Sequence, residues 1–151
     1  MKTLIADIEA DGFTPTEIFC IGIKELGHDG VMYANHPDYP SLDQAFDQFR
    51  KADRIVMHNG LGYDVPAILR LHGRDAIDET KVFDTLVTSR LVDVARQKHS
   101  LAAWGEELGH PKGDFSDFTK FSDEMAEYCL QDLEVTEAVY NKLKDCEFLD
   151  A

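Results

Sequence analysis

Apolar and polar residues repeat with two different periods along the chain, and the change of period predicts where strands give way to helices. Runs rich in β-branched and aromatic residues, bounded by turn residues, predict strands at 2–8, 17–26, 30–35 and 54–58. Apolar residues three and four apart, preceded by capping residues, predict helices at 41–52, 64–71, 84–94, 100–108 and 122–144. Three strands followed by alternating strands and helices indicate an α/β fold, a mixed sheet covered by helices.

Length and composition indicate one domain, residues 1–151, with a hydrophobic core of its own. No apolar run reaches the length of a transmembrane helix, and the first residues lead into a strand pattern rather than a signal peptide, so we expect no membrane partner. Cys20, Cys129 and Cys146 are odd in number and lack the spacing of a zinc site. We therefore expect reduced, mostly buried thiols and a cytoplasmic location.

The formal net charge of -14 argues against a broad nucleic-acid-binding surface, because such a surface is normally basic. The negative charge is unevenly distributed, however. Between residues 90 and 120 the basic and acidic side chains cancel: Arg90, Arg96, Lys98, Lys112 and Lys120 against Asp93, Glu106, Glu107, Asp114 and Asp117. Most of the other carboxylates are typical of a solvated acidic surface, and a site for divalent cations would account for a few more.

The segment IADIEADGF near the N-terminus places carboxylates at alternate positions and a glycine directly after the third. One interpretation is an EF-hand calcium loop, with Asp7, Glu9 and Asp11 at positions 1, 3 and 5. The later positions do not fit, because position 12 is Ile18 and Pro15 lies inside the loop. The preceding residues are a short β-prone run rather than a helix, so the spacing favours a buried strand that carries catalytic acids.

Acidic residues fall at particular places on the predicted elements. On a strand, Asp7 and Glu9 point to the same face about 7 Å apart, so both can reach one metal centre. On the longest predicted helix, Tyr128 and Asp132 are four residues apart and share a face. Asp64 lies at a loop-to-helix junction, where a carboxylate also suits the helix dipole. Taken singly, Tyr128 could be a half-buried aromatic, Asp132 a solvated helical charge and Asp64 a helix cap. Together with Asp7 and Glu9, these residues predict a site.

Three segments in this order, DIEA, HNGLGYDVPAI and YCLQD, resemble the three exonuclease motifs of the DEDD superfamily of 3'-5' exonucleases, in its tyrosine-bearing branch. The segments FDTLVTSRL, HSLAAWGEELG and EYCLQDLEVTEAVYNKL are similar to the proofreading domain of podovirus DNA polymerases of family A. The resemblance covers residues 3–144. It implies a ribonuclease-H-like mixed sheet with flanking helices, a DNA polymerase or replication partner, and a phage-infected bacterial host.

The resemblance also implies roles for the motif residues. Asp7 and Glu9 are the first-motif acids and Asp64 is the second-motif acid, while Tyr128 and Asp132 belong to the third motif. Two divalent ions, Mg²⁺ or Mn²⁺, about 4 Å apart can serve both ends of an in-line displacement at phosphorus. Asp7 would bridge the ions, and Glu9 and Asp132 would hold the ion on the nucleophile side. Asp64 would act on the second ion through water, and Tyr128 would orient the attacking water.

Three further residues are candidate substrate contacts. The resemblance places Asn59 beside the terminal nucleotide, and the glycines near it allow close backbone approach. His99 and Lys112 could touch the phosphate backbone. The ordinary alternatives are that Asn59 is a loop asparagine, His99 a surface histidine and Lys112 a solvated lysine.

The function expected from the sequence is a metal-dependent 3'-5' exonuclease that acts on the 3' ends of single-stranded DNA, in phage DNA replication and proofreading. A 3'-5' exoribonuclease on short RNA uses the same carboxylates and stays open as an alternative. A non-catalytic nucleic-acid-binding accessory module is a third interpretation, which the presence of all five motif residues disfavours.

Overall fold

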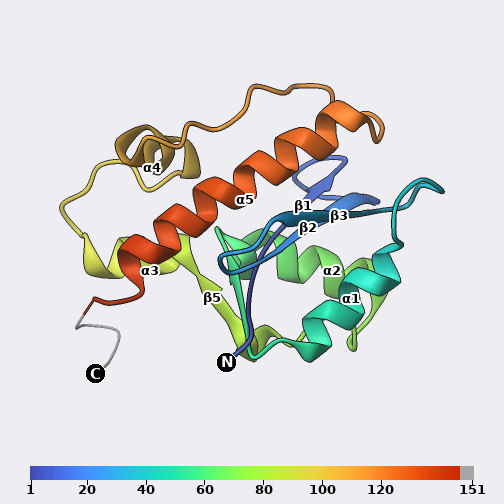
Figure 1. Cartoon of the computed structure of the whole chain (residues 1–151), viewed down its shortest axis with the longest axis horizontal. Coiled ribbons are helices and arrows are strands. Elements are labelled where there is room, and N and C mark those ends of the chain that lie inside the picture. The colour runs from blue at the N-terminus through green and yellow to red at the C-terminus, as the bar shows by residue number, and fades with distance from the viewer. Residues whose placement is uncertain (147–151) are drawn as a thin grey trace.

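Five strands form one mixed sheet in the computed structural model, which describes residues 1–146 (Figure 1). The strands lie in the order β3-β2-β1-β4-β5, with β1 at the centre. β1 pairs antiparallel with β2, and β2 antiparallel with β3, whereas β4 and β5 continue the sheet in parallel with β1. Their bounds are Thr3–Ala10, Ile18–Glu25, Gly30–Ala34, Arg54–Met57 and Val82–Asp84 for β1 to β5.

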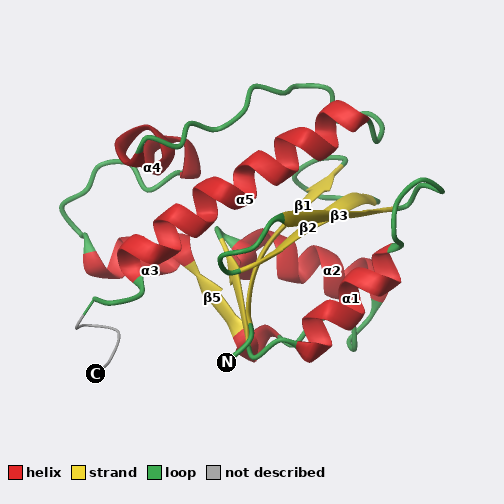
Figure 2. Cartoon of the chain, in the orientation of Figure 1, coloured by secondary structure: helices red, strands yellow, loops and turns green. Residues whose placement is uncertain are grey.

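Helices cover both faces of the sheet (Figure 2). One face packs on α1 (Leu42–Lys51) and α2 (Val65–His72). The other face packs on the long α5 (Asp123–Leu143), which crosses the strands, while α3 (Thr85–Val92) and α4 (Leu101–Leu108) lie against α5. The predicted α/β fold, a mixed sheet flanked by helices, is confirmed.

Both faces of β1 are covered, which explains why its sequence is an apolar run rather than an alternation. Leu4, Ala6 and Ile8 belong to the core on the side of α1 and α2. Ile5 points the other way and packs with Leu133 of α5. Since side chains alternate along a strand, the two residues at positions 7 and 9 also face α5. Their carboxylates therefore replace core side chains at the carboxyl end of the strand.

Charged contacts and a close backbone approach fix α5 on the sheet. The buried ammonium of Lys24 on β2 lies 3.2 Å from Glu134 and 3.6 Å from Glu137, both on α5. At Gly22 a Cβ atom would lie 3.0 Å from the Cys129 sulfur and 3.1 Å from a Leu133 methyl carbon, so a larger residue would push the helix away. The axial position of α5, and with it the position of every side chain on its inner face, is thereby set.

Small differences from the sequence prediction occur where elements are short. β5, with three residues, and a 3-10 turn at Glu79–Lys81 were not predicted, because so short a run shows no period. The turn before α2 is a π-helix, Gly60–Asp64, rather than a plain loop. α3 ends at Val92 instead of 94 because Asp93 leaves the helical conformation.

The three cysteines are free thiols and two of them are buried, as the sequence predicts. Cys20 and Cys129 are buried, Cys146 is partly exposed, and none of the three forms a disulfide. Within residues 1–146, no helix combines the length and the apolarity that crossing a bilayer requires.

The packing of α5 generates a stability prediction. Leu133→Ala removes a fully buried side chain that contacts β1 and β4, and we expect it to lower the free energy of unfolding by about 2–5 kcal/mol. Leu91→Ala is the matched control, because Leu91 on α3 is 53% exposed and its loss should cost under about 0.5 kcal/mol. Urea denaturation of both variants measures the difference. Equal costs would show that α5 is not held by this contact.

Candidate active site

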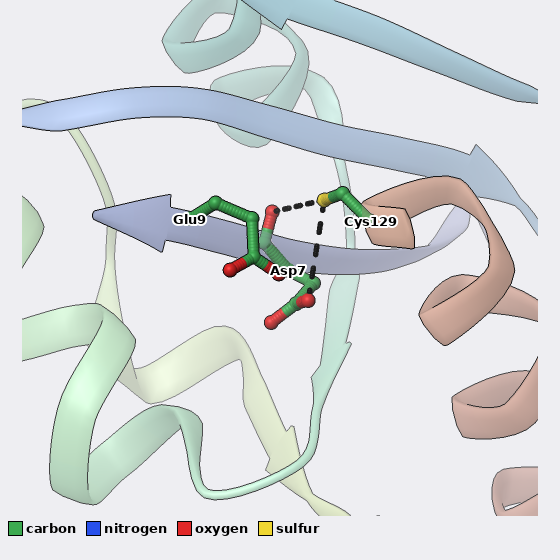
Figure 3. A group of neighbouring side chains, drawn as sticks. All are labelled: Asp7, Glu9 and Cys129. Carbon is green, nitrogen blue, oxygen red and sulfur yellow. Dashed lines mark hydrogen bonds between the residues drawn. The ribbon is translucent and has the colours of Figure 1, made fainter. Parts of the chain in front are cut away.

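The first pair of acids is carried by the central strand. Asp7 and Glu9 project from β1 toward α5, where Figure 3 shows them beside Cys129. Glu9 is buried, and Asp7 is partly exposed to the cleft. Single ligand atoms of these three residues lie within 4.8 Å of one another. The prediction that both carboxylates share one face of a strand is confirmed.

Asp64 joins this pair through a backbone hydrogen bond. The ladder between β1 and β4 stops at Ile5, so the two strands diverge beyond that point. Past the divergence, the Ile8 amide donates to Asp64 Oδ2 at 3.2 Å. Asp64 ends the π-helical turn before α2 and is buried. This hydrogen bond ties Asp64, the second-motif acid, to the strand that carries the first-motif acids Asp7 and Glu9.

α5 brings the last two residues of the predicted site. Asp132 is buried with only 4% of its side chain exposed, and Tyr128 lies one helical turn before it. The Lys112 ammonium is 3.5 Å from Asp132 Oδ2, while Asp132 Oδ1 is buried and has no hydrogen-bond partner among the described residues. The Tyr128 ring packs against Phe115 and is therefore held beside the acids.

All of the predicted site residues line one cleft of about 730 Å³. Its walls include the five motif residues and the three candidate substrate contacts: Asp7, Glu9, Asp64, Tyr128, Asp132, Asn59, His99 and Lys112. A larger hollow of about 840 Å³ lies beside α1 and the 3-10 turn, but its acidic residues, Asp75, Asp78 and Glu79, are all exposed. The buried acids therefore single out the smaller cleft as the candidate site.

Burial and mutual repulsion make the carboxylates hard to ionise. Burial raises the pKa of Asp7 to about 7, and the negative charge of Asp132 adds to the rise. Burial raises the pKa of Glu9, and Asp7 raises it further. The pKa of Asp64 is raised for the same two reasons, burial first and Asp7 second. A nearby cation would favour the ionised forms of all of them.

The donor set fits a hard divalent cation. Carboxylate oxygens are the ligands that Mg²⁺ and Mn²⁺ prefer, and the unpartnered Oδ1 of Asp132 offers one more. Cys129 makes long contacts from its sulfur to the carbonyl oxygen of Asp7, at 3.8 Å, and to its carboxylate, at 4.0 Å. A hydrogen bond with Cys20 and burial raise the pKa of the Cys129 thiol, so it acts here as a donor rather than as a thiolate ligand.

Asp84 is a site residue that sequence reasoning missed. Its buried carboxylate accepts hydrogen bonds from the Asn59 amide at 2.9 Å and the Leu61 amide at 3.0 Å. It also caps α3 by accepting from the amides of Leu86 and Val87. The cap could be recognised in the sequence, but the contact to a loop 25 residues earlier could not. Asp84 positions the loop that carries the candidate substrate contact and leads into the second-motif acid.

The candidate substrate contacts Asn59 and His99 differ in their burial and in their hydrogen bonds. Asn59 is exposed and has a left-handed backbone conformation, φ 63°, at the start of the π-helical turn. His99 is partly buried, and its Nδ1 lies 2.6 Å from the Ser89 hydroxyl. His58 was not predicted. It lines the same cleft, and its Nε2 is buried without a hydrogen-bond partner in the part of the chain that the structure describes. Burial lowers the pKa of His58 to about 4. A neutral imidazole therefore faces the cleft at pH 7.

The calcium-loop interpretation of the N-terminal acids is wrong. Residues 3–10 form a strand in the middle of the sheet, not the end of a helix. Asp11 lies beyond the strand and its carboxylate accepts from the backbone amides of Thr16 and Glu17, at 2.8 and 3.2 Å, and from the Thr16 hydroxyl. Asp11 is therefore a turn residue and not a metal ligand of a calcium loop.

Comparison with known proteins adds family membership to this geometry. The family model described as the RNase_H superfamily matches residues 4–110. The chain belongs to the RNase H superfamily. The resemblance predicted from the motifs is also confirmed, since the DNA-directed DNA polymerases of Enterobacteria phage T3 and Escherichia phage T7 are 30% and 28% identical over 93% of this chain. The chain spans 26% of the length of each polymerase.

Solved structures share the fold of this RNase H-superfamily chain. Brucella melitensis NrnC with bound Mg²⁺ superimposes with a TM-score of 0.71 at 21% identity, covering 98% of this chain and 74% of NrnC. The family B DNA polymerase from Pyrobaculum calidifontis gives 0.72 at 14% identity, covering 95% of this chain and 24% of the polymerase. With the family match, the phage relatives and the acidic cleft, the chain is a nuclease of the RNase H-like, DEDD type.

The contacts of Asp84 generate the next prediction. Asp84→Ala leaves two loop amides and two helix amides without their acceptor, and we expect a loss of about 2–4 kcal/mol in the free energy of unfolding together with weaker Mg²⁺ binding. Asp78→Ala is the control, because Asp78 caps an exposed turn away from the cleft and should change stability much less and Mg²⁺ binding not at all. Urea denaturation and calorimetry measure the two effects. Unchanged metal binding in Asp84→Ala would contradict its positioning role.

The raised pKa of Asp7 in this RNase H-superfamily site generates a pH prediction. An acid whose folded pKa lies above its unfolded value binds more protons in the folded state, so its contribution to stability falls as pH rises from about 4 to about 7. In EDTA, Asp7→Asn should therefore gain stability relative to wild type between pH 4.5 and pH 8, by at least about 1.4 kcal/mol, the equivalent of one pKa unit. Asp29→Asn is the control, because it removes one carboxylate at an exposed position away from the cleft. A difference for Asp7→Asn that does not grow with pH would refute the prediction.

Proposed function

We propose that this chain is a metal-dependent 3'-5' exonuclease that removes nucleotides from the 3' end of single-stranded DNA. The observation that carries the proposal is the convergence of Asp7, Glu9, Asp64 and Asp132, with Tyr128 beside them, in one cleft. The similarity to the phage T3 and T7 DNA polymerases supports a role in phage DNA replication, with a DNA polymerase as partner in the cytoplasm of the infected host. We assign the reaction to a single exonuclease domain.

The residues of the cleft would divide the work of phosphodiester hydrolysis. Two divalent ions, when bound, would activate a water and stabilise the leaving oxygen. Asp7 would contribute to holding both ions, and Glu9 and Asp132 would complete the site of the ion on the nucleophile side. Asp64, held by the Ile8 amide, would act on the second ion through water. Magnesium is supported by the shared fold of NrnC with bound Mg²⁺.

Tyr128 would orient the attacking water rather than bind metal. Its ring is held by Phe115, and its phenol lies on the same face of α5 as Asp132. Burial raises the pKa of Tyr128 above its usual value of 10, so the hydroxyl stays protonated at neutral pH. A protonated hydroxyl both donates and accepts a hydrogen bond, which suits it to fix one water in place.

An aromatic hollow next to the acids supports a single-stranded substrate. A hollow of about 460 Å³ is lined by Phe13, Tyr63 and Phe118, next to Glu9 and Asn59. The Phe13 ring is fully exposed, and the Tyr63 hydroxyl, which donates to the Gly12 carbonyl at 2.6 Å, holds the turn that carries it. Aromatic faces of this kind stack on unpaired bases without reading their sequence.

A second candidate function is hydrolysis of short RNA by the same acids. The observation in its favour is the fold shared with Brucella melitensis NrnC bound to pGG, with a TM-score of 0.64 at 19% identity. The two functions differ in substrate and not in chemistry, so one assay separates them.

The test is incubation with end-labelled single-stranded DNA and RNA in Mg²⁺ or in EDTA. We expect a ladder of products shortened stepwise from the 3' end of DNA, no cutting of circular single-stranded DNA, and no products in EDTA. Preferential shortening of RNA would favour the second candidate. Cutting of the circle would refute an exonuclease.

Two variants test the assigned roles within the same assay. Tyr128→Phe should lower the rate by about 10²-fold while leaving Mg²⁺ affinity intact, because it removes only a positioned hydroxyl. Asp132→Asn should lower both. Tyr33→Phe, on β3 and away from the cleft, is the matched control and should keep the wild-type rate. Equal loss of metal binding in Tyr128→Phe and Asp132→Asn, measured by calorimetry, would contradict the role of Tyr128.

A further inference from the structure

Lys112 is a cation placed among the acids by contacts on both sides of it in the chain. The preceding carbonyl, of Pro111, accepts a hydrogen bond from Gln131 Nε2 at 2.8 Å. The following residue, Gly113, packs so closely on α5 that a Cβ there would lie 2.9 Å from Gln131 Oε1 and 3.2 Å from the Tyr128 ring. The segment that carries Lys112 is therefore docked on the helix that carries Asp132, and the position of the ammonium group follows from this docking.

The ammonium group acts on several acids at once. It lies 3.5 Å from Asp132 Oδ2 and 5.3 Å from the centre of the Tyr128 ring. Asp7 and Glu9 line the same cleft, so the positive charge of Lys112 faces these two acids as well. Arg90 also lines the cleft, but it forms no ion pair with any residue that the structure describes. Lys112 is thus the side chain that partly neutralises the cluster.

The ion pair between Lys112 and Asp132 is loose enough for a stronger ligand of Asp132 to replace the ammonium group. A separation of 3.5 Å is longer than the 2.7–2.9 Å that is typical of a charge-assisted hydrogen bond. One oxygen of Asp132 is left without any partner among residues 1–146. Lys112 is also 28% exposed at the cleft, on a long side chain that can turn toward solvent. A divalent cation at Asp132 would satisfy both carboxylate oxygens better than the ammonium group does.

We propose that Lys112 is a resident counter-ion of the acidic cluster, which occupies Asp132 in the metal-free protein and is displaced when a divalent cation binds there. The ammonium group stabilises the gathered carboxylates while no metal is bound, and it competes with the metal for Asp132. Metal affinity is thereby held below what the four acids alone would give. The inference rests on the proposed function, because it takes Asp132 as a metal ligand.

The test measures metal binding without nucleic acid or turnover. Mn²⁺ and Mg²⁺ are titrated by calorimetry into the wild-type chain and into Lys112→Met, which removes the charge and keeps an unbranched side chain. We expect Lys112→Met to bind about tenfold more tightly, since a positive charge within a few ångströms of the ion is removed in a partly solvated cleft. Its melting temperature in EDTA should fall, and the rise on adding metal should exceed the wild-type rise.

Matched variants separate this role from a general charge effect. Lys120→Met makes the same change at an exposed position of the same loop and should bind metal like wild type. Lys112→Arg keeps the charge and should also remain close to wild type. If Lys112→Met does not fold, as judged by near-ultraviolet circular dichroism, Lys112→Gln takes its place in the titration.

The outcomes distinguish failure of the inference from failure of the proposed function. Affinity in Lys112→Met equal to or weaker than that of wild type would overturn the counter-ion role, as would an equal gain in Lys120→Met. If Asp132→Asn weakens metal binding while Lys112→Met does not change it, the inference fails and the proposed metal site stands. If Asp132→Asn leaves metal binding unchanged, the proposed site itself fails.

Discussion

The gathering of four carboxylates in one partly buried cleft is the constraint on which the rest of the structure depends. The negative charges of neighbouring carboxylates repel one another, and burial raises the pKa values of all four acids. Such a cluster persists only where packing elsewhere holds its members in place. Asp7 and Glu9 stand on the central strand, covered on both faces, and Asp64 is tied to that strand through the Ile8 amide. The acids are therefore attached to the central strand, where packing on both faces holds the backbone in place.

α5 meets the same constraint from the other side of the cleft. Its inner face packs Leu133 against the sheet one residue after Asp132, so the residue that anchors the helix also fixes the acid. Because a helix turns about 100° per residue, a shift in register by one residue would carry Tyr128 and Asp132 out of the cleft together. The ion pairs of the buried Lys24 with Glu134 and Glu137 oppose such a shift at the second and third turns beyond Tyr128. Stability and site geometry therefore depend on the same contacts.

The sequence predicted those features that depend on residues near one another in the chain. The buried face of α1, formed by Leu42, Ala45, Phe46 and Phe49, follows from the helical period alone. The common face of Asp7 and Glu9 follows from the strand period in the same way. Neither period reveals that Asp84 reaches a loop 25 residues earlier, or that the segment around Lys112 docks on α5. Both depend on tertiary contacts between segments whose local patterns give no sign of each other. Asp84 read alone is a helix cap, and Lys112 read alone is a surface lysine.

The net charge of -14 limits how this protein can bind nucleic acid. An acidic protein repels a polyanion at long range, so its affinity for nucleic acid has to come from a few local contacts. Under the proposed function, the aromatic rings of Phe13 and Tyr63 and the cations Arg90 and Lys112, which all line the cleft, would supply those contacts. Bound divalent ions would neutralise the negative charge of the four carboxylates, where the scissile phosphate would lie. Under the proposed function, the acidic surface disfavours binding along the length of a strand, and metal loading makes the catalytic cleft the place where a 3' end is attracted.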